Sequence, residues 1–165
     1  MHAYRTHTCG ELTLADVNTQ VRVSGWVHSK RDHGNLLFLD VRDHYGITQC
    51  VVDQSSEHFP VVEATRQESV ITVSGPVLAR SADTVNPKLA TGEVEVRIES
   101  FEVQSHAEVL PMQVAGEQEF SEEMRLRYRF LDLRREAMQQ NIALRGAIVA
   151  SIRKRMIASG FSEYQ

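Results

Sequence analysis

Apolar and polar residues alternate over much of residues 20–104, which is the period-2 pattern of strands with one buried face. Val21, Val23 and Val27 alternate with polar neighbours in the first run. The same reasoning predicts further strands at 36–41, 47–52, 69–79 and 93–104, with turns at 32–35 and 43–46. Residues 57–67 are predicted to form a short helix, with Ser55 or Ser56 as its N-cap.

The order of these elements predicts the fold class. Gly25 interrupts the first strand, and a glycine inside a strand often marks a sharp bend at a barrel corner. Five strands with a helix between the third and the fourth is the order of an OB-fold, a small barrel that binds oligonucleotides on one face. Strand order alone does not separate an OB-fold from another small barrel.

The pattern changes after residue 106. Residues 107–120 read as a connector, and Ser121 begins a helix-start signal. From Glu136 onward apolar residues recur at helical spacing, and Gly160 is a plausible C-cap. We therefore expect a mainly β protein: a five-stranded OB-fold barrel at 1–106, a hinge at 107–135, and a long α-helix within 136–165.

Composition narrows the function without naming it. The chain of 165 residues is 42% hydrophobic and has no apolar run of membrane-spanning length or signal-peptide core, so we expect a cytoplasmic protein. Its net charge is −4, distributed unevenly: residues 1–110 carry 9 Lys and Arg against 15 Asp and Glu. An acidic barrel argues against gripping nucleic acid by bulk charge, so any such contact must use a small local patch.

Motifs of catalysis are absent from the sequence. It has no glycine-rich phosphate loop, no HExxH and no nucleophile elbow, and its seven histidines are scattered. Cys9 and Cys50 lack a CxxC pairing and are expected to be free thiols. We expect no catalytic residue, no metal site and no cofactor in this chain.

Several segments resemble one family in order and spacing. They are Gly25-Trp26-Val27-His28-Ser29-Lys30-Arg31-Asp32-His33-Gly34, residues 37–43, Gly46-Ile47-Thr48-Gln49, Ala90-Thr91-Gly92-Glu93, Val109-Leu110-Pro111 and the arginine-rich stretch 127–135. Together they resemble the anticodon-binding barrel and joint of bacterial aspartyl-tRNA synthetases, which are class IIb enzymes. Residues 136–165 resemble class II motif 1, the helix that builds the homodimer interface, and the sequence ends where its Thr-Pro would follow.

This resemblance implies a set of RNA-binding residues. Phe38 would stack on the central anticodon base, uridine, while Arg31 and Gln49 would hydrogen-bond it. Glu95 matches a family acid that helps set anticodon recognition. Lys30, Arg80 and Asn86 are weaker candidates for neighbouring base or phosphate contacts.

Three of these residues have an ordinary alternative role. A phenylalanine in a strand is by default a core residue, but Leu37 and Leu39 fill the alternate face, so the pattern allows Phe38 to be exposed. Lys30 and Arg31 at a strand end are by default solvated turn charges.

His33 bears on which tRNAs would be charged. In the family this position lies beside the first anticodon base, which differs between tRNA-Asp and tRNA-Asn, and relaxed enzymes often have histidine there. We hypothesise a non-discriminating parent enzyme that charges both tRNAs with aspartate. A turn histidine without this meaning is the open alternative.

The resemblance also implies what the rest of such an enzyme does. The parent would use ATP and Mg²⁺ to form aspartyl-adenylate and would act as a homodimer, while this chain, lacking motifs 2 and 3, should be inactive alone. Two other functions stay open: a free-standing single-strand-binding module, which would tolerate any base, and a protein-interaction barrel, which would bind no RNA.

Overall fold

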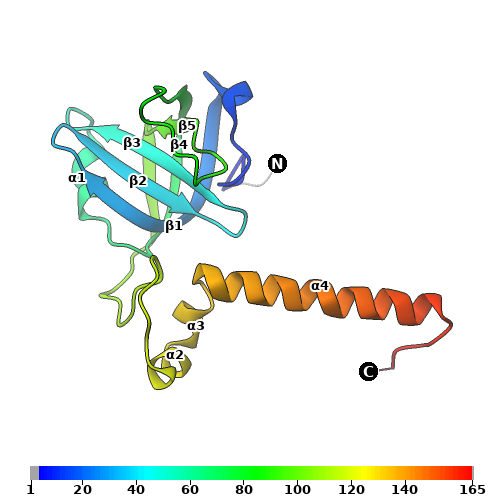
Figure 1. Cartoon of the computed structure of the whole chain (residues 1–165). Coiled ribbons are helices and arrows are strands. Elements are labelled where there is room, and N and C mark those ends of the chain that lie inside the picture. The colour runs from blue at the N-terminus through cyan, green and yellow to red at the C-terminus, as the bar shows by residue number, and fades with distance from the viewer. Residues whose placement is uncertain (1–3, 165) are drawn as a thin grey trace. The chain divides into compact units, whose positions relative to one another are not determined.

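The computed structural model describes residues 4–164, which divide between Val109 and Leu110 into two compact units (Figure 1). Along the described residues, no helix combines the length and the apolar character needed to cross a bilayer.

The first unit is one sheet that closes on itself. Its strands are β1 (Gln20–Asp32), β2 (Leu36–Arg42), β3 (Ile47–Asp53), β4 (Val70–Ala79), β5 (Val94–Arg97) and β6 (Ser100–Ser105). Neighbours follow the order β1-β2-β3-β5-β4-β6, and β1 also pairs with β4, which completes a barrel. All pairings are antiparallel except that of β3 with β5. The predicted OB-fold class is confirmed.

Gly25 lies where β1 changes partner. Residues 20–26 of β1 pair with β4, and the pairing with β2 begins at Trp26. A Cβ at Gly25 would lie 2.2 Å from the carbonyl oxygen of Arg42, so only glycine lets the strands approach this closely. The predicted barrel corner is therefore present.

The predicted fifth strand is interrupted. Residues 94–97 form β5 and residues 100–105 form β6, and both pair along β4. A Cβ at Gly75 of β4 would lie 1.8 Å from the carbonyl oxygen of Arg97, beside the interruption. The bend lets one stretch of chain reach β3 at one end and follow β4 along its length.

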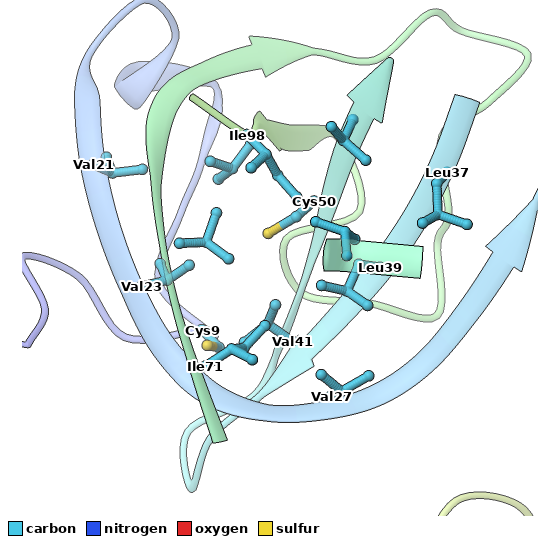
Figure 2. Close-up of a cluster of buried hydrophobic side chains, with 14 of the residues drawn as sticks. Cys9, Val21, Val23, Val27, Leu37, Leu39, Val41, Cys50, Ile71 and Ile98 are labelled. Atoms are coloured by element: carbon cyan, nitrogen blue, oxygen red, sulfur yellow. The ribbon is translucent and has the colours of Figure 1, made fainter. Parts of the chain in front are cut away.

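The core fills the barrel with aliphatic side chains from every strand. Its fully buried members include Val21, Val23, Val27, Leu37, Leu39, Val41, Ile71, Val73, Val77, Val94 and Val96. Cys9, Cys50 and Ile98 pack among them (Figure 2). Burying each such side chain stabilises the fold by about 1.5–3 kcal/mol, so the alternating pattern fixes which face of each strand points inward.

The short helix α1 (Phe59–Ala64) differs from its prediction. Its N-cap residue is His58, not Ser55 or Ser56, and Pro60 occupies the first turn, a position where proline is favoured. Ser55 is instead held by the carboxylate of Asp53, which accepts from its backbone N and its Oγ at 2.8 and 2.6 Å.

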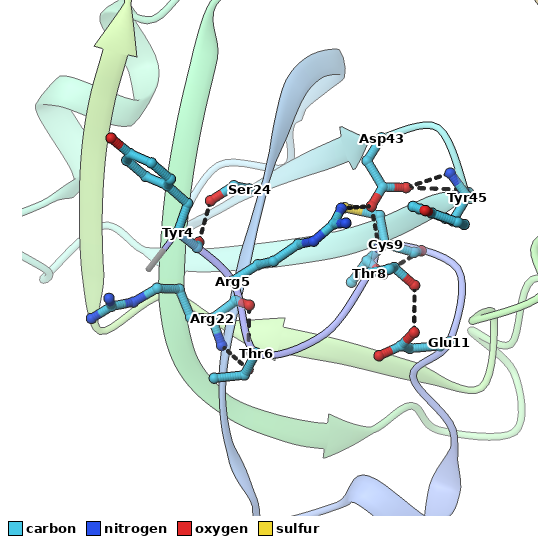
Figure 3. A network of polar contacts seen from close by, with 12 residues as sticks. Tyr4, Arg5, Thr6, Thr8, Cys9, Glu11, Arg22, Ser24, Asp43 and Tyr45 are labelled. Atoms are coloured by element: carbon cyan, nitrogen blue, oxygen red, sulfur yellow. Dashed lines mark hydrogen bonds and ion pairs between the residues drawn. The ribbon is translucent and has the colours of Figure 1, made fainter. Parts of the chain in front are cut away.

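Hydrogen bonds to the carboxylate of Asp43 connect the N-terminal segment to the turn between β2 and β3 (Figure 3). Its Oδ2 accepts from the backbone N of Cys9 at 2.9 Å and from Arg5 Nη1 at 3.4 Å. Its Oδ1 accepts from the backbone N of Tyr45 at 2.7 Å and of Gly46 at 3.0 Å. One carboxylate thus shapes the predicted turn and holds the N-terminal segment beside it.

The second unit contains α2 (Glu122–Arg127), α3 (Arg129–Asp132) and α4 (Glu136–Ala158). Ser121 caps α2 by accepting from the backbone N of Met124 at 3.4 Å, as its sequence signal indicates. Gly160 follows α4 with a φ of +87°, the left-handed conformation expected after a helix end. Met112 and Val114 of the expected connector form a small buried cluster with Leu131 of α3.

Asp132 organises the arginines of this second unit. Its side chain is fully buried, and its two oxygens accept from Arg125 Nε at 3.0 Å and from Arg129 Nη1 at 2.8 Å. Arg135 Nη1 lies 3.7 Å from Oδ1. The carboxylate in the arginine-rich stretch therefore links α2, α3 and the start of α4.

Candidate nucleic-acid interface

Strand register gathers the polar residues of the first three strands on the outer face of the barrel. Arg31 of β1 lies opposite Phe38 of β2, and Asp40 of β2 lies opposite Gln49 of β3. Alternate residues of β2 point into the core, so Phe38 and Asp40 share the outer side. The parallel pairing of β3 with β5 brings Glu95 beside Gln49.

A bulge in β1 decides that Arg31, and not Lys30, belongs to this face. The register with β2 shifts between Val27, which faces the core, and Ser29, which lies opposite Asp40. Without the shift, strict alternation would place Ser29 and Arg31 on the same side as Val27. Bulges commonly re-aim side chains in this way.

Gln49 is the centre of the polar network on this face. Its side-chain Oε1 accepts from Arg31 Nη2 at 2.9 Å and from Arg80 Nη2 at 3.3 Å. Its Nε2 donates to Glu95 Oε2 at 2.8 Å. The residue is only 4% exposed, so its amide sits at the bottom of the network.

These partners fix the polarity of the Gln49 amide. In the flipped orientation the NH₂ of the amide would face the guanidinium groups of Arg31 and Arg80, which only donate. Its oxygen would face the carboxylate of Glu95, which only accepts, so the flipped orientation is unfavourable. With both Oε1 lone pairs and one Nε2 hydrogen in use, the amide has one N–H left to offer a ligand. The site therefore presents donors more readily than acceptors.

Arg80 lies beneath the face and supports Gln49. Its side chain is 10% exposed, and its Nε lies 4.0 Å from Glu95 Oε2. Within the described part of the chain, Nε has no hydrogen-bond partner. Arg80 Nη1 also donates to the backbone oxygen of Gly92 at 3.4 Å. Arg80 and Glu95 thus form a charge pair behind the amide.

Arg31 and Phe38 form the accessible part of the face, together with His33. The Arg31 side chain is 47% exposed and Phe38 is half-buried. His33 is exposed in the β1–β2 turn, and its ring packs edge-on against Phe38, with centroids 5.4 Å apart and planes at 87°. A flat aromatic beside a guanidinium is an arrangement on which an unpaired base can stack.

The two remaining predicted residues have other immediate partners. Lys30 donates from Nζ to the backbone oxygens of Glu63 and Thr65, the latter at 2.9 Å, at the end of α1. Burial lowers the pKa of the Lys30 ammonium, against the opposing effect of Glu63. Lys30 therefore stabilises a helix end.

Asn86 shapes the loop that precedes β5. Its Oδ1 accepts from the backbone N of Lys88 at 3.1 Å, and its own backbone N donates to the oxygen of Gly92 at 3.0 Å. The same Gly92 oxygen accepts from Arg80. Asn86 is thus connected to the network through one carbonyl group.

The structure therefore brings Arg31, His33, Phe38, Gln49, Glu95 and Arg80 together and places Lys30 elsewhere. The sequence interpretation did not assign Ser29 and Asp40, although strand alternation puts Asp40 on the side of Phe38. Around Gln49 two arginines face two carboxylates, Asp40 and Glu95. The face has no excess positive charge, so recognition there must depend on stacking and directional hydrogen bonds.

Comparison with protein families gives two matches. Residues 21–104 match the family model described as OB-fold nucleic acid binding domain. Residues 121–165 match the model for class II tRNA synthetases (D, K and N).

Curated proteins of high similarity share one name. The chain is 61% identical over 165 residues to the aspartate–tRNA(Asp/Asn) ligase of Paramagnetospirillum magneticum, covering 100% of this chain and 19% of that protein. It is 61% identical over 164 residues to the ligase of the same name from Acidiphilium cryptum, covering 99% of this chain and 28% of that protein. The chain thus spans well under half the length of these relatives.

Solved structures agree on the fold. Asparaginyl-tRNA synthetase from Pyrococcus horikoshii, complexed with asparaginyl-adenylate, matches with a TM-score of 0.82 and 25% identity over 96% of this chain and 36% of its own. Aspartyl-tRNA synthetase from Entamoeba histolytica matches with a TM-score of 0.83 and 25% identity over 94% of this chain and 38% of its own.

Proposed function

This chain belongs to the OB-fold nucleic acid binding domain family, and from that premise we propose that its barrel binds the anticodon loop of tRNA as part of an aspartate–tRNA ligase. The name shared by its 61% identical relatives supports the choice of enzyme. The match of residues 121–165 to class II tRNA synthetases (D, K and N) supports the enzyme class.

The observation that carries this proposal is the network around Gln49. In the proposed complex the central uridine of the anticodon stacks on Phe38, with Arg31 and the remaining Gln49 N–H donating to its carbonyl oxygens. Cytidine carries an amino group where uridine has its O4 oxygen, so it would bring a donor against donors. An unpaired donor in a desolvated site costs about 1–3 kcal/mol, which is sufficient for base selection.

The supporting residues would act indirectly in this proposal, without contacting the base. Arg80 and Glu95 hold the amide from behind and would influence recognition through it. Asn86 would act by shaping the loop beside Arg80. Lys30, bound to the end of α1, would contribute positive charge to the region without reading a base.

His33 is proposed to adjoin the first anticodon base. Its exposed ring packs against Phe38, so a base next to the one on Phe38 would meet it. The relatives named for both tRNA-Asp and tRNA-Asn support a non-discriminating enzyme. Aspartylation of purified tRNA-Asn by the full-length enzyme tests this, and a rate no higher than the enzyme-free background would refute it.

The remaining properties of the parent enzyme are proposals as well. It would activate aspartate with ATP and Mg²⁺ in the cytoplasm, and dimerise through the motif 1 region that contains α4. Among residues 4–164 no group of three His, Cys, Asp or Glu side chains is arranged to hold a metal ion. The proposed contribution of this chain is tRNA selection.

A titration of the 165-residue chain with a tRNA-Asp anticodon stem-loop tests the proposal. A second stem-loop, in which only the central uridine is replaced, serves as the comparison. Preference for the uridine loop is expected. Equal affinity for both would favour a general single-strand binder, and no affinity for either would favour a protein-interaction barrel.

A further inference from the structure

We propose that Asp40 is a positioning residue for RNA recognition, which acts by holding the guanidinium of Arg31 in its binding orientation. This inference rests on the proposed function and extends it to a residue that the sequence interpretation did not assign. Its basis is a chain of hydrogen bonds that runs from Ser29 through Asp40 to Arg31 and Gln49.

Asp40 is buried against the strands that carry the site. Its side chain is 11% exposed, and Oδ1 accepts from Arg31 Nη2 at 3.1 Å. Its other oxygen, Oδ2, accepts from Ser29 Oγ at 2.5 Å. Each carboxylate oxygen is therefore oriented by one neighbour on β1, so the carboxylate itself has a fixed plane.

Asp40 and Gln49 share the same nitrogen of Arg31. Nη2 donates both to Asp40 Oδ1 and to Gln49 Oε1, which uses its two hydrogens. The N–H groups on Nε and Nη1 have no partner among the residues that the structure describes. These remaining N–H groups are thus available to a ligand while Nη2 anchors the guanidinium.

Anchoring matters because arginine is long and half of this side chain is exposed. An unanchored arginine would sample many rotamers and would lose that freedom when it binds RNA. Asp40 restricts the side chain before binding, so the RNA meets a guanidinium that is already placed beside Phe38 and Gln49.

Bulk electrostatics predicts the opposite effect of Asp40. A carboxylate on an RNA-binding face repels phosphates, so removing its charge from an acidic barrel should strengthen binding. The positioning role predicts weaker binding for the same change. The sign of the effect therefore separates the two.

A double-mutant cycle on the 165-residue chain tests this role, with affinity for the uridine stem-loop as its readout. Asp40→Asn is expected to weaken binding roughly tenfold, because the neutral amide loses the charge that strengthens the hydrogen bond from Arg31. Combined with Arg31→Met, Asp40→Asn should change affinity by less than about twofold, because its effect passes through Arg31. Asp53→Asn, an equal charge removal from the exposed end of β3, is the control and should leave binding unchanged or slightly tighter.

Two further measurements distinguish a loss of positioning from a loss of folding. Ser29→Ala keeps the charge and removes only the bond to Oδ2, so it should weaken binding about two- to threefold. Side-chain ¹⁵N NMR should show restricted rotation of the Arg31 guanidinium in the wild type and faster rotation in Asp40→Asn, with thermal unfolding measured in parallel.

The outcomes distinguish this inference from the proposed function. Tighter or unchanged binding by Asp40→Asn, or an equal loss in the Arg31→Met background, would overturn the positioning role. If the wild type itself did not distinguish the uridine loop from its replacement, the proposed function would fail, whatever the variants showed.

Discussion

Gln49 donates from Nε2 to Oε2 of Glu95 across 2.8 Å, which joins the β3 amide to the acid of β5. Glu95 also lies 4.0 Å from the Nε of Arg80, so one carboxylate both orients the amide and balances a largely buried guanidinium. The side chain expected to contact a base is thereby held by residues that lie beneath it.

Substituting Glu95 should therefore affect both stability and recognition. Glu95→Gln removes the charge opposite Arg80 and is expected to lower the free energy of unfolding by about 1–3 kcal/mol. It should also reduce the preference for uridine, because the Gln49 amide loses the charged acceptor that fixes Nε2. Chemical denaturation and stem-loop titration measure the two effects. Glu93→Gln, an exposed acid two residues earlier, should change neither, and similar losses in that control would contradict the account.

Phe38 and its neighbour Leu39 should separate binding from stability. Phe38→Ala removes the proposed stacking platform and is expected to cost about 1–3 kcal/mol of binding free energy. Because Phe38 is only half-buried on the outer face, the variant should remain folded. Leu39 points into the core, and Leu39→Ala should cost about 2–5 kcal/mol of folding stability. Titration and thermal unfolding of both variants check the contrast, and unchanged RNA affinity in Phe38→Ala would refute the stacking role.

The sequence predicted the positions of those site residues that follow from strand alternation, but not of those that depend on an irregularity in a strand. Alternation in residues 36–41 correctly placed Leu37 and Leu39 in the core and so opened the other side to Phe38. The separation of Lys30 from Arg31 was not predictable, because it depends on a one-residue bulge in β1 that strand periodicity does not reveal. The β1 corner was predictable because Gly25 interrupts an otherwise regular pattern.

Tertiary contacts also determined features that local patterns missed. The burial of Arg80, the residue that follows β4, results from its pairing with Glu95 of β5, which no local pattern contains. The serines before α1 looked like helix caps, but the Asp53 turn uses Ser55, and Pro60 sets the first turn. The buried cluster around Leu131 is formed by apolar residues that lie too far apart in the sequence to produce a helical or strand periodicity.

Asp132 is expected to hold the second unit together. Asp132→Asn leaves the arginines around it without their common counter-charge. Since those arginines are partly exposed and can be hydrated, the loss should be about 1–3 kcal/mol and not that of a fully buried ion pair. Hydrogen exchange of the amides at 122–135 should accelerate, while exchange in the barrel strands stays unchanged. Glu117→Gln, an exposed acid of the same unit, is the control, and slow exchange at 122–135 in Asp132→Asn would contradict this role.

The two thiols should react only when the barrel opens. Burial raises the pKa of Cys9 and Cys50 far above the ordinary thiol value, with nearby Asp43 adding to the effect at Cys9 and Asp40 at Cys50. Their thiolates are therefore scarce in the folded state. We expect slow modification by a thiol reagent at pH 8 in buffer and rapid modification in denaturant; rapid modification of the folded chain would contradict the buried placement.

The same shifts give a pH dependence with a definite sign. Since folding raises both pKa values, the unfolded chain loses these protons first as the pH rises. The contribution of the thiols to stability should be fully present below the unfolded thiol pKa and decline above it. Unfolding midpoints from pH 7 to 10, compared with those of a Cys9→Ala, Cys50→Ala variant, check this. An equal alkaline decline in both proteins would contradict it.

The most direct test of base recognition is the ratio of affinities for stem-loops with a central uridine and a central cytidine. It is measured for the wild-type chain and for Gln49→Met, which keeps the side-chain length without its donor and acceptor. We predict that the wild type prefers uridine by a factor of about five or more, from about 1–3 kcal/mol for one mismatched donor, and that Gln49→Met binds both loops nearly equally. Equal affinities in the wild type, or an unchanged ratio in Gln49→Met, would contradict the claim that the Gln49 network reads the anticodon.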